Sequence, residues 1–179
     1  MALAKPCLFL DRDGIINKDV GYAYRPEQMQ FMPSIFSVCR YFQRRGYLIV
    51  IVTNQSGIAR NYYGEDDFSA LNIWLKHEFL RRGIVLNSIK HCPHHPTISG
   101  DCDCRKPRPG MLLEAAKELN IDLKNSIMIG DKSSDMQAGC HAGVGFNVWI
   151  KPDHVPYRRK APYNCARFKN LSDFLAKLS

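Results

Sequence analysis

Continuous apolar runs alternate along the chain with segments whose apolar residues recur at helical spacing. The apolar runs predict strands at residues 7–11, 47–52, 88–91, 127–129 and 145–150. The helical spacing predicts helices between Ser34 and Gly46, at about 65–82, at 109–119, from about 133 onward, and at about 171–178. This alternation predicts an α/β fold, a Rossmann-like parallel sheet with helices on both faces and no large cap domain.

Local signals mark several helix ends and one buried face. Ser34 is expected to cap its helix, Gly83 to end the second one and Asn120 to end the third. In the second helix one stripe of apolar side chains is expected to pack into the core. That stripe consists of Phe68, Leu71, Leu75 and Phe79.

The 179 residues suit a single domain spanning 1–179, with 45% hydrophobic and 23% charged residues. No apolar run approaches the roughly 18 residues of a membrane helix, and the first residues lack a signal-peptide layout. We therefore expect a cytoplasmic protein without a membrane partner. The absence of a large inserted cap favours a small monomer.

The excess of 25 basic over 17 acidic residues gives a net charge of +8, which favours anionic partners. Phosphorylated metabolites or a solvated surface account for this charge better than nucleic acid does. A zinc-dependent nucleic-acid-binding module would need aromatic residues interleaved with the basic ones. The densest basic stretch, residues 157–160, offers little of that and is expected to be exposed tail.

Chemically useful polar residues follow three of the predicted strands. Asp11 and Asp13 come after the first, residues 53–54 (Thr-Asn) after the second, and residues 131–132 (Asp-Lys) after the fourth. In open parallel sheets, ligands bind outside the carboxyl ends of the strands. These residues are therefore expected to line one crevice.

Such groups can hydrolyse a phosphate ester. A carboxylate can attack phosphorus, and Mg²⁺ accepts one or two carboxylates together with phosphate oxygens. Asp11 and Asp131 supply carboxylates, and Asp13 can add an oxygen from its side chain or its backbone. Asp135 is either a partner that orients a water or a lysine, or a carboxylate favoured by the start of a helix.

Positive and hydrogen-bonding groups must also surround the transferring phosphoryl oxygens. Thr53 offers a hydroxyl, the backbone after it offers N–H groups, and Lys106 offers a point charge. The alternative for Lys106 is a solvent-facing loop lysine. Its place two residues after Cys104, a probable metal ligand by spacing, favours the functional interpretation.

Three of the seven cysteines crowd beside histidines in the loop at about 91–105. In a chain without an export signal this pattern indicates metal before disulfides. The expected structural zinc ligands are Cys92, His94, Cys102 and Cys104, with His91 or His95 as alternatives to His94. Cys7, Cys39 and Cys140 are expected to be small core residues, and Cys165 has no assigned role.

Four segments in order resemble the motifs of the haloacid dehalogenase superfamily of phosphohydrolases. They are residues 11–14 (Asp-Arg-Asp-Gly), residues 53–54, Lys106, and residues 130–131 with Asp135, and the resemblance runs from about residue 8 to 150. Within that superfamily, segments 53–60, 102–107 and 130–132 and the Cys/His loop resemble the heptose bisphosphate phosphatases. The histidinol-phosphate phosphatases are near relatives of that group.

The resemblance implies Asp11 as the nucleophile and Asp13 as general acid and then base. It implies Mg²⁺ on Asp11, Asp13 and Asp131, with Thr53 and Lys106 stabilising the phosphoryl group. It places Zn²⁺ on the four residues given above, in a loop that delivers Arg105 and Lys106. The substrate contacts it implies are Asp19, Val20, Gly21, Tyr22, Thr53, Asn54, Gln55, Ser56, Arg105, Lys106 and Lys132.

The implied reaction removes the 7-phosphate of D-glycero-D-manno-heptose 1,7-bisphosphate through an aspartyl-phosphate. This step would serve nucleotide-activated heptose biosynthesis for bacterial surface glycans. Histidinol phosphate or another small phosphorylated metabolite is the alternative substrate. Segment 95–101, between the two pairs of zinc ligands, is shorter than in this group, which leaves the anomer preference open.

Overall fold

The computed structural model describes residues 3–151 and 165–178, which form a six-stranded parallel sheet. The strand order is β3-β2-β1-β4-β5-β6. The strands are β1 (Cys7–Leu10), β2 (Leu48–Asn54), β3 (Ser88–Cys92), β4 (Ile127–Gly130), β5 (Phe146–Ile150) and β6 (Cys165–Phe168). All five pairings are parallel, as the alternation of predicted strands and helices required.

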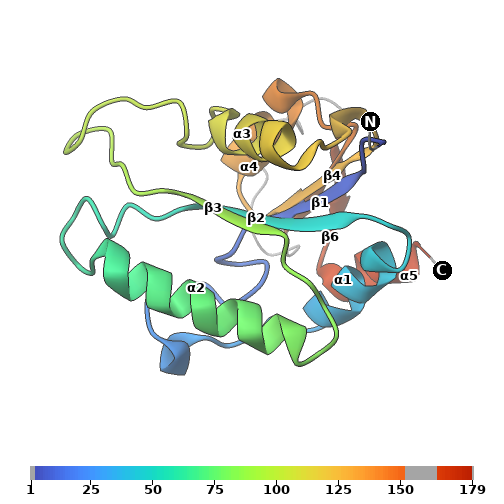
Figure 1. The fold of residues 1–179 in the computed structure, drawn as a ribbon, viewed down its shortest axis with the longest axis horizontal. Helices are drawn as coiled ribbons and strands as arrows, with labels where there is room; N and C mark the ends of the chain where they lie inside the picture. The colour runs from blue at the N-terminus through green and yellow to red at the C-terminus, as the bar shows by residue number, and fades with distance from the viewer. Residues whose placement is uncertain (1–2, 152–164, 179) are drawn as a thin grey trace.

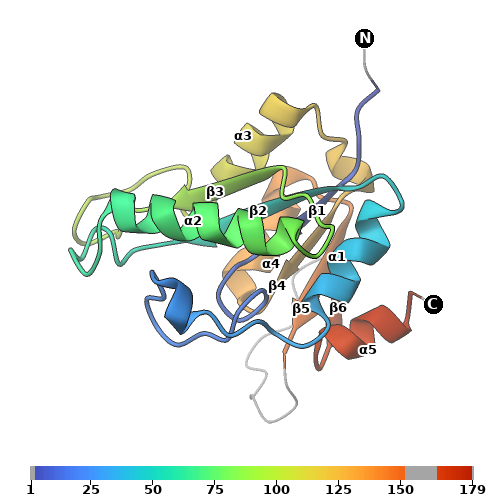
Figure 2. The ribbon, with the colours of Figure 1, turned by 60° about the horizontal axis from the view of Figure 1, so that its bottom comes forward.

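Helices cover both faces of this sheet. Figure 1 shows α3 and α4 on one face and α1, α2 and α5 on the other. Their bounds are α1 (Ile35–Gln43), α2 (Glu65–Leu80), α3 (Gly110–Leu119), α4 (Ser133–Ala142) and α5 (Leu171–Ala176), with short 3-10 turns at Pro26–Gln28 and Leu123–Asn125. Figures 1 and 2 both show α5 lying beside α1, and Tyr41 of α1 donates a 2.8 Å hydrogen bond to the carbonyl of Leu178.

Each strand of the centre buries both of its faces, because successive side chains point to opposite sides of a sheet. In β1, Leu8 and Leu10 pack with α1, α2 and α5, whereas Cys7 and Phe9 pack with α3 and α4. All four side chains are fully buried. This two-sided burial explains why the central strands appear in the sequence as uninterrupted apolar runs.

The chain order creates a switch point between β1 and β4. From β1 the sheet grows through β2 to β3 on one side, and from β4 through β5 to β6 on the other. Loops that leave neighbouring strands in opposite directions open a crevice at the carboxyl ends of those strands. In Figure 1 the loops after β2 and β3 extend beyond this same end of the sheet.

Two sequence-based expectations about local structure were wrong, and one strand was missed. Strand β6 was not predicted, because it is a four-residue edge strand with a charged arginine in its middle. Ser34 makes no side-chain cap; its φ is 66°, and its hydroxyl lies 2.7 Å from that of Ser172 in α5. Cys140 is partly exposed, whereas Cys7 and Cys39 are buried as expected.

The basic stretch at 157–160 lies outside the described residues. None of the helices within 3–151 and 165–178 combines the length and the hydropathy needed to cross a bilayer.

Candidate active site

Three carboxylates gather where β1 and β4 end. One oxygen from each of Asp11, Asp131 and Asp135 lies within 4.8 Å of the others. Asp11 directly follows β1, Asp131 directly follows β4, and Asp135 lies in the first turn of α4. Gly14, at φ 93°, passes so close to the Asp131 carboxylate that a Cβ there would collide with it.

Lys106 joins this group from the loop after β3. Its Nζ lies 2.7 Å from Asp11 Oδ1 and 2.6 Å from Asp135 Oδ1, and it also donates to the carbonyl of Val52 at 2.7 Å. Asn54 fixes the Lys106 backbone through two 3.1 Å hydrogen bonds, one to its N–H and one to its carbonyl. The lysine is 3% exposed, so the solvent-facing alternative is wrong.

The charge balance of this cluster leaves room for a cation. Burial raises the pKa of Asp11 to about 7 against the opposing charge of Lys106. Burial likewise raises the pKa of Asp131 to about 6. Asp131 Oδ1 is buried without a hydrogen-bond partner. Three carboxylates still outnumber the two nearby lysines, Lys106 and Lys132, and one carboxylate oxygen is unpartnered. This arrangement fits a hard divalent ion such as Mg²⁺.

The raised pKa values predict how Mg²⁺ binding depends on pH. Below about pH 6 both Asp11 and Asp131 are largely protonated in the metal-free protein. The apparent Mg²⁺ affinity should then fall by up to about a hundredfold per pH unit, because two protons are displaced. The Mg²⁺-induced rise in Tm, measured from about pH 8 to about pH 5, should shrink accordingly.

The metal content of the same samples is the control for this titration, because loss of a second metal from the Cys/His loop would lower Tm independently. A Mg²⁺-induced rise in Tm that does not change with pH would contradict this assignment of the carboxylates.

Asp13 takes a separate position. Its carboxylate accepts from the Arg12 guanidinium at 3.0 to 3.3 Å, from Asn17 Nδ2 at 3.1 Å and from Gln55 Nε2 at 3.0 Å. Its side chain is therefore outside the group of three carboxylates, and a metal contact through its backbone oxygen stays a prediction. Arg12, which is fully buried, was not among the expected site residues. An arginine between two aspartates at a strand end was the available signal.

A cavity of about 560 Å³ opens next to these groups. Its lining residues are Asp13, Asp19, Gly21, Tyr22, Asn54, Gln55, Ser56, Tyr63, Arg105, Lys106, Lys132 and Ser134. Most of the expected substrate contacts are among them, but Val20 and Thr53 are not; Thr53 lines the smaller neighbouring cavity beside Asp11. Tyr63 and Ser134 were missed, since a tyrosine in a loop or a serine at the start of a helix carries no distinctive sequence signal. Lys132 Nζ lies 3.3 Å from Asp19 Oδ2 at the exposed part of this cavity.

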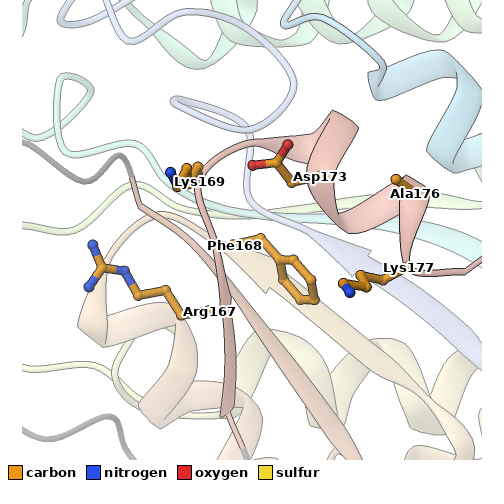
Figure 3. Close-up of a pocket in the computed structure, with 6 residues that line it drawn as sticks. All are labelled: Arg167, Phe168, Lys169, Asp173, Ala176 and Lys177. Atoms are coloured by element: carbon orange, nitrogen blue, oxygen red, sulfur yellow. The ribbon is translucent and has the colours of Figure 1, made fainter.

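A second hollow of about 560 Å³ lies between β6 and α5. Figure 3 shows its lining, with the charged groups of Arg167 and Lys169 on one side of Phe168 and that of Lys177 on the other. It shares no residue with the first cavity, and its single carboxylate, Asp173, does not belong to either metal-ligand group of the described residues. The phosphate chemistry therefore belongs to the first cavity.

The Cys/His loop folds into a compact group of four donor atoms. Neighbouring donors lie 3.3 to 3.7 Å apart, among them Cys92 Sγ and Cys102 Sγ at 3.5 Å and His94 Nδ1 and Cys104 Sγ at 3.3 Å. A zinc tetrahedron with bonds of about 2.3 Å has edges of about 3.8 Å. Burial, reinforced by the neighbouring thiols, raises the pKa of Cys104, so a thiolate at Cys104 needs a cation. At Cys102, burial is outweighed by hydrogen bonds, which lower the pKa of that thiol.

The two alternative histidines lie elsewhere. His91 Nε2 contacts Glu65 at 2.9 Å, and His95 Nε2 lies 2.8 Å from the Arg60 guanidinium. Of the three histidines considered, the structure brings His94 to the cysteines.

Several known proteins are similar in sequence to this chain over most of its length. A family model described as HAD-hydrolase-like matches residues 103–147. The D-glycero-alpha-D-manno-heptose-1,7-bisphosphate 7-phosphatase of Campylobacter jejuni is 48% identical over 168 residues, covering 94% of this chain and 92% of that protein. The D-glycero-beta-D-manno-heptose-1,7-bisphosphate 7-phosphatase of Vibrio cholerae is 46% identical over 154 residues, covering 83% of each.

Solved structures agree with these relatives. The D,D-heptose 1,7-bisphosphate phosphatase from B. bronchiseptica, complexed with magnesium and phosphate, has a TM-score of 0.83 and 25% identity over 97% of both chains. The parallel sheet and the carboxylate group at its switch point are consistent with the fold and the activity of these relatives. This chain belongs to the heptose-1,7-bisphosphate 7-phosphatase family of HAD-like hydrolases.

Proposed function

We propose that the protein hydrolyses the 7-phosphate of D-glycero-D-manno-heptose 1,7-bisphosphate in nucleotide-activated heptose biosynthesis for bacterial surface glycans. The observation that carries this proposal is the Asp11 carboxylate, held against buried Lys106 beside a cavity that Arg105 and Lys132 also line. A nucleophile at one end and two further cations nearby suit a sugar that carries a phosphate at each end.

In the first step an Asp11 oxygen attacks the 7-phosphorus, and the bond from phosphorus to the sugar oxygen breaks. Asp13 donates its proton to that leaving oxygen. Water then attacks the phosphorus of the aspartyl-phosphate, Asp13 accepts the water proton, and Asp11 is released with inorganic phosphate. Lys106 and the Thr53 hydroxyl stabilise the equatorial oxygens in both steps.

Asp11, Asp131 and an oxygen of Asp13 would hold Mg²⁺, which would supply positive charge to neutralise the phosphoryl oxygens. Asp135 holds Lys106 Nζ at 2.6 Å, and its other oxygen accepts from the Lys132 N–H at 2.9 Å. Asp135 therefore orients the catalytic lysine and also caps the N-terminus of α4.

We also propose a structural zinc ion, bound by Cys92, His94, Cys102 and Cys104. A closed set of four protein ligands leaves no open position for substrate. Arg105 NH1 donates to the His94 carbonyl at 3.0 Å, so the zinc loop also fixes one cation of the substrate cavity.

Turnover on a substrate panel tests the proposed reaction. We expect kcat/KM for heptose 1,7-bisphosphate, assayed as both anomers, to exceed that for histidinol phosphate by about a hundredfold or more. Heptose 7-phosphate is the matched control, and losing the 1-phosphate should cost about tenfold or more in kcat/KM. A preference for histidinol phosphate would replace the proposed substrate with the alternative.

A further inference from the structure

We infer that Gln55 is a positioning residue, which through its side-chain amide holds Asp13 and Thr53 in their working orientations. The inference rests on the proposed function, which gives Asp13 the proton transfers and Thr53 a phosphoryl contact. The resemblance had implied instead that Gln55 contacts the substrate directly.

Every polar group of Gln55 is already used inside the protein. Its backbone N–H donates to the Cys92 carbonyl at 2.7 Å, and its carbonyl accepts from the Ile58 N–H at 3.2 Å. The side-chain amide makes four further hydrogen bonds, and the residue is 3% exposed. Gln55 therefore has no spare donor to offer a substrate, although it lines the cavity.

Arg12 decides which way the Gln55 amide faces. An Arg12 NH2 group lies 3.1 Å from one end of the amide, and Tyr63 OH lies 2.6 Å from that same end. A guanidinium can only donate, so the oxygen of the amide must face Arg12. The amide nitrogen, with its two hydrogens, must then face the catalytic groups.

Those two hydrogens reach one catalytic residue each. Gln55 Nε2 donates to Asp13 Oδ2 at 3.0 Å and to Thr53 Oγ1 at 2.8 Å. Because Thr53 Oγ1 accepts there, its own hydrogen must point elsewhere. A cavity of about 30 Å³, which Thr53 lines together with Asp11 and Lys106, is available to receive it. The Thr53 hydrogen is thus free to donate to a phosphoryl oxygen.

The reverse amide orientation would harm both groups. It would place an amide oxygen against the Asp13 carboxylate, and it would draw the Thr53 hydrogen away from the phosphoryl site. Arg12 prevents this from a position where it is fully buried. A chain of hydrogen bonds from Arg12 and Tyr63 through Gln55 therefore sets the geometry of proton donation.

Gln55→Glu tests the inference, since it keeps the size and the Arg12 contact but removes the donor to Asp13 and Thr53. We expect kcat on phenyl phosphate to fall about a hundredfold, with KM changed by less than about threefold. On para-nitrophenyl phosphate the loss should be about tenfold smaller, because that leaving group needs little proton donation from Asp13.

Tyr63→Phe is the second variant and removes only one hydroxyl from the chain. It should lower kcat about fivefold in the same leaving-group-dependent way, and it decides the matter if Gln55→Glu fails to fold, as judged by Tm and zinc content. Tyr47→Phe, the same change just before β2 and away from the substrate cavity, should leave both rates unchanged.

Equal losses on the two aryl esters would overturn the link to Asp13. A higher KM with unchanged kcat would also overturn the inference, since Gln55 would then be a direct substrate ligand. Neither ester contains a sugar, so failure of the proposed heptose substrate would appear separately, as wild-type protein that hydrolyses aryl phosphates but not the heptose bisphosphate.

Discussion

Asp11→Asn should abolish phosphate release, with kcat lower by about four orders of magnitude or more. Asparagine has the same shape, and its amide oxygen can still accept from Lys106 Nζ, which lies 2.7 Å from Asp11 Oδ1. The variant therefore keeps the geometry of the site and loses the nucleophile. Steady-state phosphate release from the heptose bisphosphate at saturating Mg²⁺ measures the effect.

The thermal stability of the Asp11→Asn variant should not fall together with its activity. Burial raises the pKa of Asp11 to about 7, so the folded protein holds a proton there that the unfolded chain has released above its ordinary pKa of 3.8. Stability from this group is therefore present at low pH and is lost as pH rises toward 7. Without Mg²⁺ at about pH 8, the Tm of the Asn variant should be equal to or higher than that of the wild type.

Asp66→Asn is the matched control, because Asp66 is exposed at the start of α2, away from the site. It should retain wild-type turnover. If Asp11→Asn kept activity within about tenfold of the wild type, covalent catalysis at Asp11 would be excluded.

The sheet and the place of the site could be predicted from the sequence for one physical reason. Central parallel strands are buried on both faces, so they appear as apolar runs, and the first polar residue after each run marks its carboxyl end. Asp11 after β1 and Asp131 after β4 lie at the switch point for that reason. The edge strand β6, with an exposed Arg167 in its middle, lacks this signature.

The part of the Asp13 hydrogen-bond network that involves Gln55 could not be predicted, because Gln55 lies 42 residues from Asp13 in the sequence. Arg12 looks like a surface cation until the fold places it against Gln55, and the carbonyl of Ala23 accepts from its guanidinium at 2.7 Å. The sequence pattern also left three histidines open for zinc. Only the path of the backbone after β3 decides that His94 faces the cysteines.

The four-donor group of Cys92, His94, Cys102 and Cys104 predicts the largest effect on stability. Cys102 Sγ lies 3.5 Å from Cys92 Sγ and 3.4 Å from Cys104 Sγ, so it bridges the two ends of the loop. Cys102→Ser would remove one of four zinc ligands and free these ends from each other. Because metal binding contributes directly to folding, the loss should be about 3–5 kcal/mol, or about 10 °C in Tm for a chain of this size.

The same substitution should weaken substrate binding, because the loop leads directly from Cys104 to Lys106. Without zinc, Lys106 would be held only by Asn54, the Val52 carbonyl and the buried carboxylates. We expect the zinc content to fall from one to about a tenth per chain, and KM to rise about fivefold or more. Atomic absorption, thermal unfolding and steady-state kinetics measure the three effects.

Cys140→Ser, the same change in α4 and outside the donor group, should leave all three unchanged. Unaltered zinc content and Tm in the Cys102 variant would show that the loop is not a zinc clamp.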